Sequence, residues 1–161
     1  MKAVRMVEIG KPLELQEIPI PGFGEKDILA RVRAAGICHS DAHYRAGRSA
    51  MGFMPITLGH EVAGIVEKIG SRVTNVKIGD RVCLHYNITC GDCYYCSTGN
   101  EQFCDKGKML GHHVDGGYAE YMRLQLHAIA AGVGLTYELL TGDLSQVNYS
   151  SIRAGLIEFR R

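Results

Sequence analysis

Four cysteines crowded into one short segment constrain this chain more than any other feature of its sequence. They follow the pattern Cys90-x2-Cys93-x2-Cys96-x7-Cys104. Gaps of two residues let one tight turn present successive sulfurs to a single ion, and zinc in structural sites takes four such ligands in a tetrahedron. We therefore expect a closed zinc site that holds a loop in place. Because it leaves no ligand position open, we assign it no chemistry.

Two other uses of these cysteines stay open from the sequence alone. Disulfides between sulfurs at such short range would be strained, and an iron–sulfur cluster also takes four thiolates. The chain opens with Met-Lys-Ala-Val-Arg and has no apolar leader segment. This argues against a secreted disulfide scaffold and predicts a cytoplasmic protein.

Charge and hydropathy exclude two classes of partner. The formal net charge is +1, from 18 basic and 17 acidic side chains. That balance gives no reason to expect nucleic acid or an anionic membrane surface as a partner. No apolar run is long enough to span a bilayer as a helix.

Hydrophobic periodicity predicts a mainly β fold with a change of character near Arg123. Apolar and polar residues alternate, or form short apolar runs, in five expected strands: 2–7, 13–18, 27–35, 61–69 and 81–84. The chain has 20 glycines, many at the ends of these runs, as a small antiparallel barrel with tight turns requires. From about residue 125 onward the sequence is typical of helices, and Ser150-Ser151 could cap one. We thus expect a β domain over 1–123 and a helical tail over 124–161.

A second group of residues has the chemistry of a catalytic zinc site. Cys38 follows an expected strand, and His60 and Glu61 come about twenty residues later. Cys38 and His60 offer one sulfur and one nitrogen, and Glu61 could bind the ion or stand behind it. Asp41 could accept a hydrogen bond from the far nitrogen of His60 and so fix its tautomer.

Two further side chains beside this group could move a proton. Ser40 and His43 could carry a proton from a zinc-bound alcohol to solvent. The alternative interpretation is that Cys38 is a small buried apolar residue and His60 an ordinary histidine. The four-cysteine segment nearby favours the metal interpretation.

The order of these motifs resembles the medium-chain zinc-dependent alcohol dehydrogenase family. The resemblance covers about residues 1–122 and rests on the four cysteines and three further runs: Gly-Ile-Cys-His-Ser-Asp at 36–41, Gly-His-Glu-Val-Ala-Gly at 59–64 and Val-Lys-Ile-Gly-Asp-Arg-Val at 76–82. It implies a GroES-like antiparallel β-barrel with a zinc-binding loop. It also implies reversible NAD(P)-dependent oxidation of a small alcohol to an aldehyde.

The resemblance also implies roles for individual residues. It places the catalytic zinc on Cys38 and His60, with Glu61 beside it and Asp41 supporting His60. It makes Ser40 and His43 the proton relay. It puts His39 where the family contacts the cofactor pyrophosphate.

Parts of the family pattern have no counterpart in this sequence. The Gly-x-Gly-x-x-Gly turn of a Rossmann domain is absent, and no cysteine follows Cys104 to supply a further ligand of the catalytic zinc. We therefore expect the 161-residue chain to be incomplete for turnover. A barrel lacking its usual partner domain should also expose an apolar face through which it could self-associate.

The tail has a different resemblance. Residues 124–161, and above all Gly134 to Ser151, resemble a fragment of tailed-phage portal proteins. This predicts that the chain joins two unrelated segments. Two alternative functions follow: a zinc-binding remnant without turnover, or a structural portal-like protein identified by its tail.

Overall fold

The computed structural model describes residues 1–125 and 129–130, which form a mainly β structure. Its strands are β1 (Lys2–Met6), β2 (Glu14–Glu17), β3 (Asp27–Gly36), β4 (Ile56–Thr57), β5 (Glu61–Ile69), β6 (Arg81–Leu84), β7 (Asn87–Ile88), β8 (Lys108–Met109), β9 (Tyr121–Gln125) and β10 (Ile129–Ala130). Three short helices interrupt them: α1 (His39–Arg45), α2 (Tyr94–Ser97) and the 3-10 helix η1 (Glu101–Phe103).

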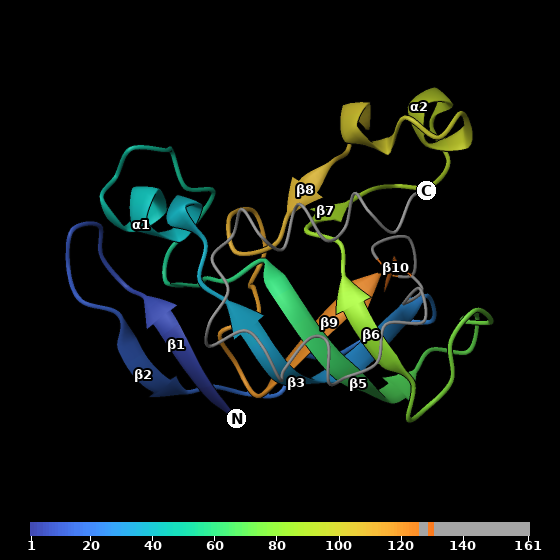
Figure 1. Ribbon diagram of the computed structural model, residues 1–161, viewed down its shortest axis with the longest axis horizontal. Helices are drawn as coiled ribbons and strands as arrows, with labels where there is room; N and C mark the ends of the chain where they lie inside the picture. The colour runs from blue at the N-terminus through green and yellow to red at the C-terminus, as the bar shows by residue number, and fades with distance from the viewer. Residues whose placement is uncertain (126–128, 131–161) are drawn as a thin grey trace, which may run out of the picture. The chain divides into compact units, whose positions relative to one another are not determined.

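The strands form three antiparallel sheets (Figure 1). The largest has the order β10-β6-β5-β3-β9, a second has the order β2-β1-β4, and β7 pairs with β8. The five strands expected from periodicity are all present, with ends that differ by at most one residue. The mainly β, antiparallel fold is therefore confirmed.

The described strands do not close into a barrel as expected. In the five-stranded sheet β10 and β9 are the two edges, and no strand pairing within residues 1–125 and 129–130 joins them. The ladder between β3 and β5 shifts register between Leu29 and Ala30 and again between Val32 and Ala34. Such bulges bend and twist a sheet without closing it.

Gln125, Ile129 and Ala130 differ from the helical expectation. β9 continues to Gln125, and Ile129 and Ala130 pair with Leu84 and Cys83 of β6. Pairing to an available sheet edge outweighs the weak helical preference of these residues. The helix expected from Ile152 and the rest of the tail lie outside the described residues.

Two apolar clusters form the core. The larger collects aliphatic side chains from β3, β5, β6 and β9 with their neighbours: Ile28, Ala30, Val62, Val66, Val73, Val82, Leu84, Leu110, Met122 and Leu124. The smaller contains Met6, Ile56 and Leu58, against which Tyr44 and Tyr118 pack. Each fully buried aliphatic side chain contributes about 1.5–3 kcal/mol. The smaller cluster matters for function because it fixes α1 beside the segment that leads into β5.

Candidate metal centres

The four cysteines lie together in the segment that contains α2, which Figure 1 labels, and η1. Cys93 precedes the first residue of α2, Cys96 lies within α2 and Cys104 directly follows η1. The turn after Cys90 passes through Gly91, whose φ of 74° is a conformation that favours glycine. As a result, the four sulfur atoms all lie within 4.8 Å of one another.

The separations between the sulfurs match a single tetrahedral ion. They are 3.5 Å for Cys93 and Cys96, 3.6 Å for Cys104 and Cys90, and 3.9 Å for Cys90 and Cys96. A zinc ion with Zn–S bonds of about 2.3 Å holds its sulfurs about 3.8 Å apart. All four thiols are free, so the disulfide alternative does not hold here. The cluster is consistent with a structural zinc site.

The thiols of this cluster have different tendencies to ionise. The backbone amide of Cys96 lowers the pKa of Cys93 to about 7. The hydrogen bond between Asp92 and Cys90 raises the pKa of the Cys90 thiol to about 12. A bound cation deprotonates coordinating thiols whatever their starting pKa. Metal binding at this cluster therefore releases protons, and the raised pKa values of the Cys90 and Cys96 thiols mean that both are protonated before the ion binds.

The pairing of β3 with β5 assembles the second group. In that ladder Gly36 lies opposite Glu61, which brings Cys38, two residues beyond, next to His60. The sulfur of Cys38, a ring nitrogen of His60 and a carboxylate oxygen of Glu61 lie within 4.8 Å of one another. A β-carbon at Gly36 would collide with the Glu61 carboxylate, so glycine makes room for that side chain.

Asp41 links the segment that carries Cys38 to the segment that carries His60. Its side chain is buried, with 5% exposure. Its Oδ2 accepts a hydrogen bond of 3.1 Å from the backbone N–H of Cys38, and its Oδ1 accepts one of 3.2 Å from the N–H of Gly59. Nδ1 of His60 faces Oδ1 at 3.6 Å. That contact leaves Nε2 as the nitrogen available to a metal ion.

The charges of this pair are strongly coupled. Burial alone would raise the pKa of the Asp41 carboxyl, but the neighbouring His60 and Tyr118 side chains outweigh burial, and the pKa lies below its usual value. In turn Asp41 raises the pKa of His60 to about 9, against the opposing effect of burial. Without metal, the pair therefore carries an imidazolium beside a carboxylate at neutral pH.

Tyr118 is a residue of this site that the sequence analysis missed. Its hydroxyl donates a hydrogen bond of 2.9 Å to Oδ2 of Asp41 and also lies 3.1 Å from the carbonyl oxygen of Gly36. Burial and the hydrogen bond to Asp41 both raise the pKa of this hydroxyl, so it stays a donor. No local sequence pattern links Tyr118 to Asp41, which lies 77 residues earlier in the chain.

Gly59 allows Tyr118 to reach this position. Its φ is 93°, and a β-carbon there would lie 2.5 Å from Cδ1 of the Tyr118 ring. The backbone of Tyr118 donates to the carbonyl of Leu58 at 3.0 Å, and that of Gly117 donates to Gly59 at 2.9 Å. The segment that carries His60 is thus held face to face with the segment that carries Tyr118.

The remaining residues singled out from the sequence lie on or next to α1. Ser40 Oγ lies 3.6 Å from the sulfur of Cys38. His39 is exposed and His43 half-buried, and their ring centroids are 4.6 Å apart. Among the hydrogen bonds of residues 1–125, none joins Ser40 directly to His43.

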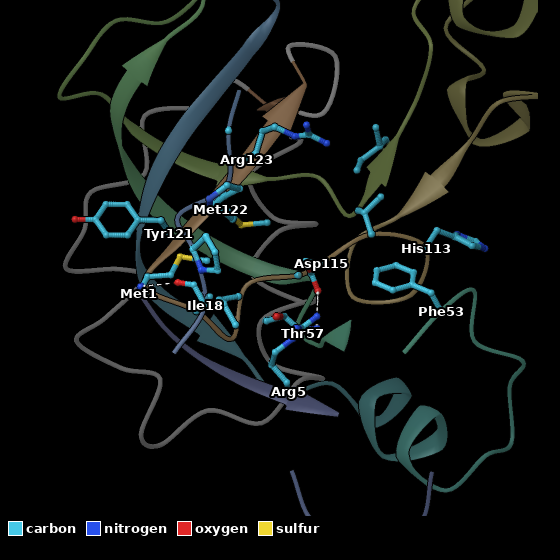
Figure 2. A pocket seen from close by; sticks show the side chains of 17 residues that line it. Met1, Arg5, Ile18, Phe53, Thr57, His113, Asp115, Tyr121, Met122 and Arg123 are labelled. Carbon is cyan, nitrogen blue, oxygen red and sulfur yellow. Dashed lines mark hydrogen bonds and ion pairs between the residues drawn. The ribbon is translucent and has the colours of Figure 1, made fainter. Parts of the chain in front are cut away.

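A cavity of about 540 Å³ has a lining separate from both clusters (Figure 2). Figure 2 shows Met1, Ile18, Tyr121 and Met122 on one side of it and Phe53 and His113 on the other. None of the seven residues of the two metal clusters lines this cavity.

In the described part of the chain, no helix is long and apolar enough to cross a membrane.

Comparison with known protein families gives two matches. Residues 24–131 match the model of the alcohol dehydrogenase GroES-like domain. Residues 108–161 match the model of the phage portal protein, lambda family. Both resemblances found in the sequence are therefore confirmed, and the two matches overlap over residues 108–131.

Individual relatives agree with the first match. The chain is 45% identical over 130 residues to an NAD-dependent alcohol dehydrogenase of Sulfurisphaera tokodaii, covering 76% of this chain and 38% of that protein. It is 42% identical over 128 residues to an L-threonine 3-dehydrogenase of Symbiobacterium thermophilum, covering 76% and 36%.

A solved structure of an alcohol dehydrogenase is also similar to this chain. The crystal structure of the alcohol dehydrogenase from Aeropyrum pernix has a TM-score of 0.81 and 32% identity, covering 89% of this chain and 43% of that one. The chain thus spans well under half the length of each of these three proteins.

Proposed function

Because the chain belongs to the alcohol dehydrogenase GroES-like domain family, we propose that it is the zinc-binding part of an NAD(P)-dependent alcohol dehydrogenase that interconverts small alcohols and aldehydes. One observation carries this proposal. Cys38, His60 and Glu61 converge within 4.8 Å, and a buried carboxylate orients the histidine from behind. Catalytic zinc sites take ligands of these types and keep one position open for substrate.

The residues of both clusters fit the ions we assign to them. The four cysteines would hold a structural zinc, since their sulfur separations match a tetrahedron of thiolates. Cys38 and Nε2 of His60 would hold the catalytic zinc, with Glu61 binding it or standing beside it. A zinc ion bound there acts as a Lewis acid that polarises an alcohol or carbonyl oxygen.

This chain's own residues then orient the site and move the proton. Asp41 faces Nδ1 of His60 and fixes the tautomer that offers Nε2. Tyr118 and the N–H groups of Cys38 and Gly59 hold Asp41 in place. Ser40, 3.6 Å from the sulfur of Cys38, is the first acceptor of the alcohol proton, and His43 passes it to solvent.

His39 is the residue that we assign to the cofactor. It is the first residue of α1 and is exposed, so its imidazole can reach a phosphate approaching from outside this domain. The proposal for His39 and the relay rests on the family pattern. The positions of the side chains on α1 are compatible with it.

A domain exchange tests the proposed function. Residues 1–131 are joined to the remainder of the Sulfurisphaera tokodaii relative in place of its own matching segment. We expect the purified hybrid to reduce NAD in the presence of a primary alcohol. Cys38→Ser in the same hybrid should abolish that reduction, whereas Cys83→Ser, at a free thiol on β6 outside both metal clusters, should retain it. A folded, zinc-loaded hybrid without alcohol-dependent NADH formation would refute the proposal.

The portal match supports a second proposal, about the tail. We propose that the chain joins the metal-binding domain to an unrelated portal-like segment, and the boundary expected at residue 123 falls inside the overlap of the two family matches. Sequencing the coding DNA in long reads from an independent sample tests this. An unbroken frame through codons 108–131 supports a natural fusion, and reads that always separate the two segments contradict it.

A further inference from the structure

Helix α1 carries two histidines one turn apart. His39 and His43 are four residues apart, a spacing that places their side chains on the same face of a helix, with β-carbons about 5–6 Å from each other. Their ring centroids are 4.6 Å apart and the rings meet edge to face at 86°. His39 is exposed and His43 half-buried, so solvent ions reach the pair.

This face of α1 is opposite to the one that carries Asp41. Asp41 lies two residues from each histidine, which corresponds to about 200° around the helix axis. Its burial at 5% exposure, against the exposed His39, agrees with this geometry. Neither histidine belongs to the group of possible metal ligands formed by Cys38, His60 and Glu61.

We propose that His39 and His43 together bind a divalent transition-metal ion, distinct from the two zinc ions assigned above. Neutral imidazole suits zinc, copper and nickel ions. Two nitrogens at Zn–N distances of about 2.0–2.1 Å can both be supplied by adjacent turns of one helix. Water completes the coordination, so this ion is held more weakly than the one in the four-thiolate cluster.

The site has a consequence that rests on the proposed function. Because His43 would pass the substrate proton and His39 would contact the cofactor phosphate, an ion held between them removes both nitrogens from use. Excess zinc would then inhibit the assembled enzyme reversibly, without displacing the zinc on Cys38 and His60. The His39–His43 pair would thus be an inhibitory metal-binding site of the assembled enzyme.

Zinc titration of the full chain tests the site directly. The chain is first loaded with zinc and freed of excess ion, and further Zn²⁺ is then added in a calorimeter. We expect one additional, weaker zinc, whose binding shifts the imidazole NMR signals of His39 and His43. His39→Ala and His43→Ala should each lower the affinity for this additional zinc at least about tenfold. Removing a residue that only supports a metal ligand already lowers affinity roughly 10–100-fold, and removing a ligand itself lowers it at least as much.

Matched variants make the result specific. Arg45→Ala, at the exposed end of the same helix, and His113→Ala, in the neighbouring pair of rings His112 and His113, should leave the additional zinc unchanged. The proposal is overturned if no additional zinc binds, if it survives both substitutions on α1, or if it is lost in His113→Ala. Cys38→Ser separates the two proposals, because it removes the catalytic zinc and should leave the His39–His43 ion in place.

Discussion

The hydroxyl of Tyr118 donates a hydrogen bond of 2.9 Å to Oδ2 of Asp41, across 77 residues of sequence. Through Asp41 this hydroxyl acts on His60, whose Nδ1 lies 3.6 Å from the other carboxylate oxygen. The tyrosine therefore orients a proposed metal ligand without touching the metal. In zinc sites such outer partners fix the ligand tautomer and raise its basicity.

Replacing Tyr118 with phenylalanine tests this relationship. Tyr118→Phe removes the hydroxyl and keeps the ring that packs against Met6, Ile56 and Leu58. A hydrogen bond to a charged group contributes about 1.5–3 kcal/mol, so we expect a loss of that order in the free energy of unfolding, measured in urea. Tyr121→Phe is the control, since the hydrogen bonds to the Asp41 carboxylate come from Cys38, Gly59 and Tyr118. Equal stability losses in the two variants would contradict the role given to Tyr118.

Replacing Asp41 with asparagine should weaken zinc at Cys38 and His60 and leave the four-cysteine zinc in place. We expect a loss of about 10–100-fold in affinity for the more weakly held ion, measured by competition with a chelator. Asp115→Asn is the matched control, because Asp115 also accepts a backbone hydrogen bond, from Thr57 at 2.7 Å, but outside the site. The same affinity in Asp41→Asn and the parent chain would argue against the outer-partner role.

The pH dependence of the metal-free chain gives a separate check on Asp41 and His60. Since Asp41 raises the pKa of His60 from 6.5 to about 9, the protonated histidine stabilises the folded state. This contribution is complete below about pH 6.5 and is lost as the pH rises through about 9. NMR titration of the His60 ring should show a raised pKa in the parent chain and a lower one in Asp41→Asn. A His60 pKa that the substitution leaves unchanged would refute the coupling.

Gly59 and Gly79 allow a controlled test of backbone and contact effects. Both have positive φ, 93° and 91°, so alanine strains the backbone at each by about 1–2 kcal/mol. Only at Gly59 would the new β-carbon meet the Tyr118 ring, whereas at Gly79 nothing lies within 4 Å. Gly59→Ala should therefore cost about 1–3 kcal/mol more in unfolding free energy than Gly79→Ala. Equal costs would show that Tyr118 does not pack as described.

Zinc content distinguishes the two clusters. We expect two zinc ions per purified chain by elemental analysis, one of them lost on mild chelation. Cys104→Ser should remove the tightly held ion, because a closed four-thiolate site needs all its ligands. Cys83→Ser, at a free thiol outside both clusters, should keep both ions. A parent chain with a single, tightly held zinc would mean that only the four-cysteine site assembles.

Local patterns predicted the strands and the four-cysteine cluster well. The strands at 61–69 and 81–84 have the expected bounds because alternation and short apolar runs record which face of a strand is buried. Local pattern failed at Ile129 and Ala130, which pair with β6 although their composition favours a helix. Ile129 pairs with Leu84 at the edge of the sheet, 45 residues earlier in the chain. A prediction from neighbouring residues does not include so distant a partner.

The residue types and their spacing along the chain set the chemistry available to this protein, whereas folding brings together the groups that act jointly. The spacing of Cys90, Cys93, Cys96 and Cys104 is local, so a short turn suffices to gather them around an ion. The meeting of Asp41 with Tyr118 depends on Gly59 accepting a close approach between two distant segments. Hydrogen-bond partners separated by many residues are set by packing of the whole fold, which leaves no periodic signal in the chain.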